Sequence, residues 1–279
     1  MSDIVSCIAG LQRFLDLSLT AETISEKLEP YPATMAAHTL RTVLEDRGYD
    51  VAAIEEPDTK RVNRYVRIES LSNGDCGDCA EAIPLEGTVA RATALRDCLA
   101  PIVNQGRVFV LGRRGVEEII TRADLDKQPV RLLLFGVLSA LEMAMLALLR
   151  QRFQEGSWRE YLSPERLEKA QTILDDRQHR NEELDLADCL QIYDKVRILL
   201  KDAEVLSAWG FGSRNGAQKF FGRLQRLRDR LAHAHDPASG SNWEDVVSTF
   251  RKAEEMLSTS IRLLRSQEIA RFEPMRTEG

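Results

Sequence analysis

A helix, strand, strand pattern occurs twice in the first half of the chain. The first occurrence predicts a helix over residues 33–47, a turn at Gly48 and strands over residues 51–54 and 62–68. The second predicts a helix over residues 89–100, a turn at 104–106, strands over 107–111 and 116–120, and a short helix that opens at Thr121. Two copies of one unit, each about 50 residues long, predict an internally duplicated α+β domain. A helical stripe over residues 4–17 is expected to cap it.

The second half of the chain has only helical patterns. They predict helices over residues 132–152, 164–180, 186–201, 216–231 and 241–264, the last opened by a Ser241/Glu244 capping box. Five helices with short polar connections are typical of an all-α up-and-down bundle. We therefore expect an α+β domain over residues 1–128, a helical domain over 129–268 and a disordered tail over 269–279.

Residues 132–149 form an apolar run of 18 residues that carries one charge, Glu142. This length is the minimum for a membrane-spanning helix, and a carboxylate at the midpoint makes insertion unfavourable. A helix buried in the bundle explains the same pattern, so we expect no membrane association.

The charge and the cysteine content bear on the partners and the location of the protein. The formal net charge of −6 means that any contact with nucleic acid depends on a local basic patch. Five scattered cysteines favour a reducing, cytoplasmic location. Cys76 and Cys79 form a lone Cys-x-x-Cys without a second ligand pair, so we interpret them as surface thiols and expect no metal site.

Basic residues are concentrated along the predicted helix over residues 216–231. An apolar seam contains Phe220, Leu224, Leu227 and Leu231. Between residues 214 and 230 six basic residues face a single acid, a local charge of +5. The pattern suits either a phosphate-binding surface or a solvated arginine face. The basic residues are Arg214, Lys219, Arg223, Arg226, Arg228 and Arg230.

The second α+β copy contains residues 107–111 (RVFVL) and 119–125 (IITRADL), and with them the duplicated unit resembles a tandem CBS domain pair. The resemblance implies an adenine nucleotide as regulatory ligand, with Thr121 bonding a phosphate and Asp124 holding ribose hydroxyls. Glu118 stands at the family's glycine position, and Ser70 replaces the aspartate in the first copy, so at most one site is expected. The alternative is that Thr121 and Asp124 are a helix N-cap and a first-turn acid.

The heptapeptide over residues 227–233 (LRDRLAH) is followed by His235, Asp236 and Pro237. It places a permanent cation near a group that titrates around neutral pH. It resembles the signature of HEPN domains. The resemblance implies a metal-independent endoribonuclease that acts on RNA as a homodimer and needs no cofactor. Toxin and host-defence roles occur in that family.

Under this resemblance, the three motif residues have separate roles. Arg228 holds the scissile phosphate, and Asp229 orients one of the reacting groups or bonds RNA. His233 takes the proton of the 2′-hydroxyl or, from the other subunit, protonates the leaving oxygen. On an unbroken helix Arg228 and His233 would point about 140° apart. Either the helix ends or bends near Leu231, before Pro237, or the arginine reaches around it.

Three functions remain open from the sequence. The first is a nucleotide-regulated, metal-independent endoribonuclease. The second is a non-catalytic adenine-nucleotide-binding regulatory dimer, and the third is a partner subunit of another enzyme.

Overall fold

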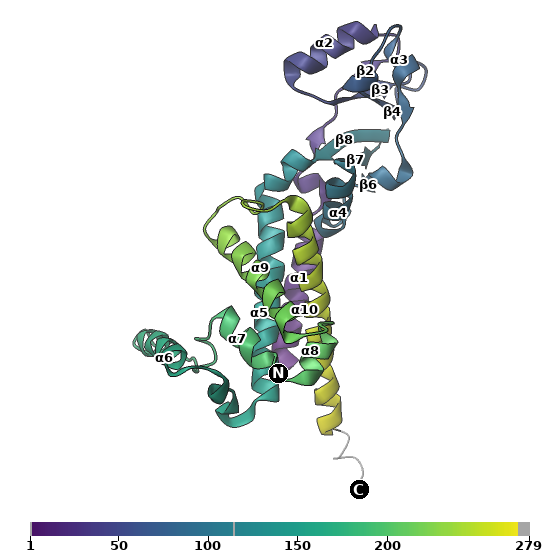
Figure 1. Ribbon diagram of the computed structural model, residues 1–279. Coiled ribbons are helices and arrows are strands. Elements are labelled where there is room, and N and C mark those ends of the chain that lie inside the picture. The colour runs from purple at the N-terminus through teal and green to yellow at the C-terminus, as the bar shows by residue number, and fades with distance from the viewer. Residues whose placement is uncertain (1, 114, 273–279) are drawn as a thin grey trace. The chain divides into compact units, whose positions relative to one another are not determined.

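The computed structural model describes residues 2–113 and 115–272 (Figure 1). It divides into a helical unit, Met1–Leu15 with Leu134–Gly279, and an α+β unit, Asp16–Leu133. Helix α1, Ser2–Ser18, lies for most of its length in the helical unit. This differs from the expectation that the first helix caps the duplicated domain, because an amphipathic stripe does not specify which core it joins.

The predicted duplication is present in the α+β unit. Its first copy contains β2 (Pro30–Pro32), α2 (Ala37–Arg47), β3 (Val51–Glu55) and β4 (Val62–Arg67). Its second contains β6 (Thr88–Ala90), α4 (Leu95–Gln105), β7 (Arg107–Gly112) and β8 (Gly115–Thr121). Each copy thus begins with a short strand that the sequence patterns missed, and the helix prediction over residues 89–100 was wrong at its start. Three residues are too few to show a strand period.

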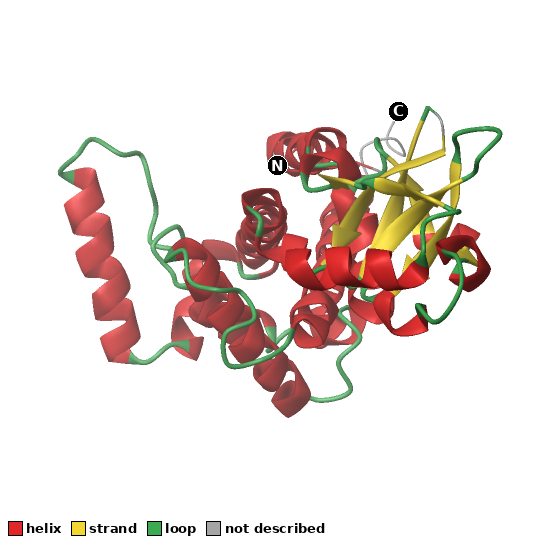
Figure 2. Ribbon diagram, turned by 90° about the horizontal axis from the view of Figure 1, so that it is seen from above, coloured by secondary structure: helices red, strands yellow, loops and turns green. Residues whose placement is uncertain are grey.

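Short elements complete this unit. They are η1 (Ala21–Thr23), β1 (Glu26–Lys27), η2 (Ile68–Ser70), α3 (Cys76–Cys79), β5 (Glu81–Ala82), η3 (Leu85–Gly87) and η4 (Arg122–Asp126). All strands of the described chain belong to this unit, as the yellow arrows in Figure 2 show.

One sheet joins the two copies, in the order β2-β3-β4-β8-β7-β6. The joint is the parallel pairing of Val62 in β4 with Gly115 in β8. Gly115 has φ +117°, and a Cβ atom there would lie 2.9 Å from the Val62 carbonyl oxygen. Only glycine adopts this backbone conformation at such a close approach without strain.

Strand β3 is buried on both faces. Ala52 and Ile54 pack in one apolar cluster with Leu40 and Leu44 of α2, and Val51 and Ala53 pack in a second with Phe109 of β7. The first cluster also contains Cys76, which is completely buried, so the interpretation of Cys76 as a surface thiol was wrong. The alternating contacts tie the helix of one copy to the strands of the other.

The mostly helical character predicted beyond residue 129 is confirmed. Its elements are α5 (Gln128–Arg152), η5 (Gln154–Tyr161), α6 (Pro164–Gln178), α7 (Ile192–Leu199), α8 (Ala203–Ala208), α9 (Arg214–Ala232) and α10 (Trp243–Phe272). Hydrogen bonds tie α5 to α10, from Gln151 Nε2 to the Leu264 carbonyl, and α8 to α10, from Trp209 Nε1 to Ser260 Oγ.

Local polar groups explain two differences from the predicted helices, and a third concerns the end of the last helix. Helix α7 begins only at Ile192, because Asp185 Oδ1 accepts hydrogen bonds from the Ala187 and Asp188 amides and holds that segment in turns. Helix α10 is capped by Asn242, whose Oδ1 accepts from the Asp245 amide, rather than by Ser241. The helix also extends to Phe272, so the predicted tail is helical over residues 269–272; residues 273–279 lie outside the described part.

Helix α5 is the one described helix that is long and apolar enough to cross a membrane, and 61% of its most apolar window is buried inside the structure. Its central Glu142 pairs with the buried Lys195 Nζ at 2.8 Å. These contacts agree with the prediction that the apolar run is a core helix.

Candidate functional site

A cleft of about 660 Å³ lies in the α+β unit, between its two copies. The first copy and the residues before it contribute Tyr31, Tyr49 and Asp50, and the second contributes Arg107 and the stretch from Thr121 to Asp124. The volume falls in the range usual for small-molecule sites. The remaining lining residues are Glu26, Lys27, Leu28, Glu29, Gly48, Val51, Gly106 and Ile119.

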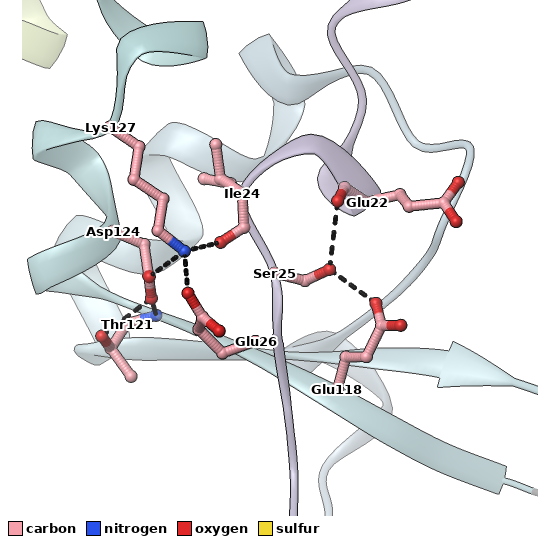
Figure 3. Close-up of polar contacts among 8 residues, drawn as sticks. All are labelled: Glu22, Ile24, Ser25, Glu26, Glu118, Thr121, Asp124 and Lys127. Carbon is pink, nitrogen blue, oxygen red and sulfur yellow. Dashed lines mark hydrogen bonds and ion pairs between the residues drawn. The ribbon is translucent and has the colours of Figure 1, made fainter.

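The two residues predicted as ligand-binding, Thr121 and Asp124, both line this cleft and contact each other (Figure 3). The Thr121 amide and hydroxyl donate to Asp124 Oδ2 at 2.7 and 2.9 Å. Lys127 Nζ pairs with Asp124 Oδ1 at 2.8 Å and also with Glu26. The buried carboxylate therefore caps η4 and is neutralised by a lysine, as in the N-cap interpretation.

Glu118 points elsewhere. It lies on β8 in alternation with the cleft residues Ile119 and Thr121, and its carboxylate accepts from the Ser25 hydroxyl at 2.5 Å and pairs with Arg91 at 2.6 Å (Figure 3). It is not part of the cleft lining. Glu118, which stands where the CBS motif has a glycine, thus places no negative charge in the cleft wall.

The cleft wall carries charge of both signs. Arg107 pairs with Asp50 at 2.8 Å, whereas Lys27 is exposed and has no ion-pair partner among the described residues. The Tyr31 hydroxyl is buried and makes no hydrogen bond of standard geometry in the described chain, although the Glu29 carboxylate lies close enough to interact with it. Burial, together with the neighbouring Glu29 carboxylate, raises the pKa of Tyr31. A neutral phenol is a donor that a polar ligand could satisfy.

A smaller cleft of about 380 Å³ also lies in the α+β unit. Its wall includes Tyr65, Arg67, Gln105 and Phe109, and Arg107 lines both clefts. Ser70, which replaces the expected aspartate in the first copy, is not part of this wall. Of these two clefts, the larger one has the Thr-x-x-Asp pattern in its wall and the smaller one does not.

The sequence did not single out Tyr31, Asp50 or Arg107. The available signal was the glycine that ends the helix of each copy: Gly48 and Gly106 have φ +67° and +82° and precede Asp50 and Arg107. A duplicated unit brings the turns after its two helices to one interface, but the sequence patterns did not establish that arrangement.

The residues predicted as catalytic lie at the end of α9. The helix continues through Ala232, and His233 is its C-cap. Arg228 is half-exposed and pairs with Asp229 at 3.5 Å. His233 is exposed, and its ring centroid lies 6.1 Å from that of His235. The prediction that the helix ends near Leu231 agrees with this boundary.

Within one chain the helix does not bring Arg228 and His233 onto one side. Five residues along a continuous α-helix turn the side chains about 140° apart. Asp229 neutralises part of the Arg228 charge. A site that needs both groups on one phosphate therefore requires the arginine to reach around the helix or a second copy to supply one of the two groups. Among the described residues, no group of three or more His, Cys, Asp or Glu side chains could hold a metal ion.

No protein-family model matches the chain, and no curated protein matches it. Solved structures similar to the N-terminal 40% or so of the chain are CBS-domain proteins. A CBS-pair protein from Arabidopsis thaliana is 13% identical with a TM-score of 0.36, covering 41% of this chain and 96% of its own. A CBS domain protein from Pyrobaculum aerophilum complexed with AMP is 15% identical with a TM-score of 0.34, covering 38% and 90%.

Proposed function

We propose that the protein is a nucleotide-regulated protein whose α+β unit binds an adenine nucleotide in the larger cleft. The observation that carries the proposal is the shared wall of that cleft: both copies contribute to it, and it contains the Thr-x-x-Asp pattern, the buried Tyr31 hydroxyl and the lysine without an ion-pair partner, Lys27. The choice of adenine nucleotide follows the motif resemblance of residues 119–125.

Each lining group has a role that suits a nucleotide. Lys27 and Arg107 supply cations for phosphate oxygens. Asp124 keeps acceptor capacity for ribose hydroxyls beyond its bonds to Thr121 and Lys127. The Tyr31 hydroxyl can donate to a ligand acceptor, and the exposed Tyr49 ring offers an aromatic face.

Ligand binding would reach the rest of the chain through η4. This element contains Asp124 and is followed directly by α5, which continues into the helical unit. A nucleotide that binds one arrangement of η4 better than another shifts the population towards it, by at most the difference in affinity.

Titration calorimetry of the full chain with AMP, ADP and ATP tests the binding. We expect binding that Arg107→Gln and Tyr31→Phe each weaken about tenfold, since each removes one polar contact to the ligand. The matched control is Arg61→Gln, which removes an exposed arginine outside the cleft and should leave affinity unchanged. No heat with any of the three nucleotides, or equal losses in control and cleft variants, would contradict the proposal.

RNA cleavage by the helical unit is a second candidate function. It is favoured by the end of α9 at Ala232, which leaves His233 exposed and free to approach a substrate. Because Arg228 and His233 diverge within one chain, we propose a homodimer in which one copy's Arg228 holds the phosphate and the other copy's His233 transfers the proton.

Incubation of the protein with RNA in EDTA tests this candidate. Cleavage products that end in a 2′,3′-cyclic phosphate, and their loss in Arg228→Ala and His233→Ala, are expected. Mixing the two inactive variants should restore activity if the site forms between copies. Intact RNA together with normal nucleotide binding would leave the non-catalytic regulatory dimer, or the partner subunit of another enzyme, as the function.

A further inference from the structure

A second charged cleft lies wholly within the helical unit, between α9 and the first turns of α10. Its volume is about 200 Å³. Three arginines of α9, Arg223, Arg226 and Arg230, form one wall, and Ser241, Asp245 and Thr249 lie on the other. The wall therefore carries three positive charges against one carboxylate.

The helical repeat explains why these arginines share a face. Arg223, Arg226 and Arg230 follow one another at three and four residues, and Lys219 precedes them by four. The four side chains fall within about 60° on the helix, next to the buried seam. Arg228 lies about 160° from Arg230, so it is not part of this row. One residue beyond the helix, His233 continues on the side of Arg226 and Arg230.

Several other arginines of the protein have carboxylate partners. Arg47, Arg67, Arg107, Arg150 and Arg166 each pair with a carboxylate. Lys219, Arg223 and Arg226 have no ion-pair partner among the residues that the structure describes, although the chain has an excess of acids. Arg223 instead lies over the Phe220 ring, 6.0 Å from its centroid, and Arg230 donates to the Pro237 carbonyl at 2.8 Å.

We propose that this cleft binds the phosphate groups of a single-stranded RNA. The row from Lys219 to Arg230 spans about 16 Å of helix, which is long enough for successive phosphates of a strand and too long for one phosphate ion. The guanidinium groups of Arg223 and Arg226 can bind phosphate without first losing an ion-pair partner. A strand along the row passes His233, so Arg226 and Arg230 position the RNA backbone beside that imidazole.

The choice of RNA rests on the second candidate function, and the test therefore measures binding separately from cleavage. Fluorescence anisotropy of a short labelled single-stranded RNA is compared for the full-length protein and for the Arg223→Gln/Arg226→Gln variant. We expect a loss of affinity of about tenfold or more, and a salt slope about 1.4 smaller in magnitude, because two phosphate contacts are removed.

The matched control is Arg197→Gln/Arg265→Gln, which removes two exposed arginines on α7 and α10 that have no ion-pair partner among the described residues and lie outside the cleft. It should leave both quantities nearly unchanged. The His233→Ala variant should bind RNA like the wild type. A wild-type protein that binds RNA but does not cleave it would overturn the nuclease candidate and leave the assignment of the cleft standing.

Three results would overturn the assignment of the cleft. They are no RNA binding by the wild type, equal weakening by cleft and control variants, and displacement of the RNA by tripolyphosphate at equal phosphate concentration. The last would mean that the cleft binds small anions rather than a strand. Circular dichroism of both double variants shows whether the fold is retained, as expected for exposed positions.

Discussion

The two clefts of this protein use positive charge in opposite ways. In the wall of the α+β cleft Arg107 pairs with Asp50, and Glu26 and Asp124 pair with Lys127, although Lys27 has no ion-pair partner among the described residues. On α9 the cations Lys219, Arg223 and Arg226 have no such partners among the described residues. A ligand of the first cleft therefore meets charges that are mostly paired, with Lys27 as the exception, whereas a ligand of the second meets several cations without ion-pair partners.

This difference predicts two kinds of binding. A balanced cleft selects its ligand by shape and hydrogen bonds, and responds weakly to salt. An unbalanced row binds through counterion release, and its affinity falls steeply as salt rises.

The largest expected effect comes from destabilising the α+β unit alone. Gly115→Ala should lower the free energy of unfolding of the α+β unit by about 2–3 kcal/mol, because it forces alanine to a positive φ beside the Val62 carbonyl. Nucleotide binding should weaken with it, while RNA binding persists. The three tryptophans, Trp158, Trp209 and Trp243, all lie in the helical unit, so tryptophan fluorescence should show an unchanged transition while circular dichroism shows the loss.

The matched control is Gly10→Ala on the exposed side of α1, where no atom lies within 4 Å of the new Cβ. It should stabilise the helix by about 0.5–1 kcal/mol. A Gly115→Ala protein as stable as the wild type would show that the two copies do not depend on this joint.

A second prediction compares a paired with an unpaired arginine in the helical unit. Arg166 contacts both carboxylate oxygens of the buried Asp194 at 2.8 Å and ties α6 to α7. Arg166→Ala should cost about 2 kcal/mol, because the carboxylate loses charge-assisted hydrogen bonds. Arg226→Ala should cost less than about 0.5 kcal/mol, as is usual for an exposed surface position. Urea unfolding followed by tryptophan fluorescence measures both, and similar losses would remove the contrast.

The third prediction concerns salt. With about three phosphate contacts, RNA affinity should fall about 20-fold when the salt concentration rises fourfold. Nucleotide affinity should change less than about threefold over the same range, because the α+β cleft is nearly neutral in sum. Anisotropy and calorimetry in parallel salt series provide the comparison. Equal salt slopes would show that both clefts bind through net charge.

The smallest expected effect is at Glu118. Its carboxylate contacts Ser25 and Arg91 outside the cleft wall, so Glu118→Gln should change nucleotide affinity by less than about twofold. Calorimetry with the nucleotide that binds most tightly measures it. A marked gain in affinity would mean that this acid does repel phosphate, as its place in the motif suggested.

Long periodic patterns were predicted well. The helix–strand–strand duplication, the turns at Gly48 and Gly106 and the helical second half were all predicted from spacing. The short strands β2 and β6 were not, since their residues are defined by pairing with β3 and β7 rather than by a local pattern. The start of α7 was also missed, because the Asp185 side chain competes with helical hydrogen bonds there.

The candidate sites divide in the same way. Thr121 and Asp124 were recognised from a local motif, and the structure places both in a cleft wall. Tyr31 and Asp50 were missed, because they approach Arg107 only after the first copy packs against the second. On α9 the sequence showed the basic row but favoured Arg228, and the unbroken helix separates that arginine from Arg223, Arg226 and Arg230.

The sequence by itself determined the repeat, the helical class of the second half and the concentration of positive charge on one helix, because each depends on residues a few positions apart. The tertiary structure decided which charges are neutralised and which remain available, since an ion pair such as Arg107–Asp50 joins residues 57 positions apart. Charge that is set by composition acquires a role only when packing decides what lies within hydrogen-bonding distance of it.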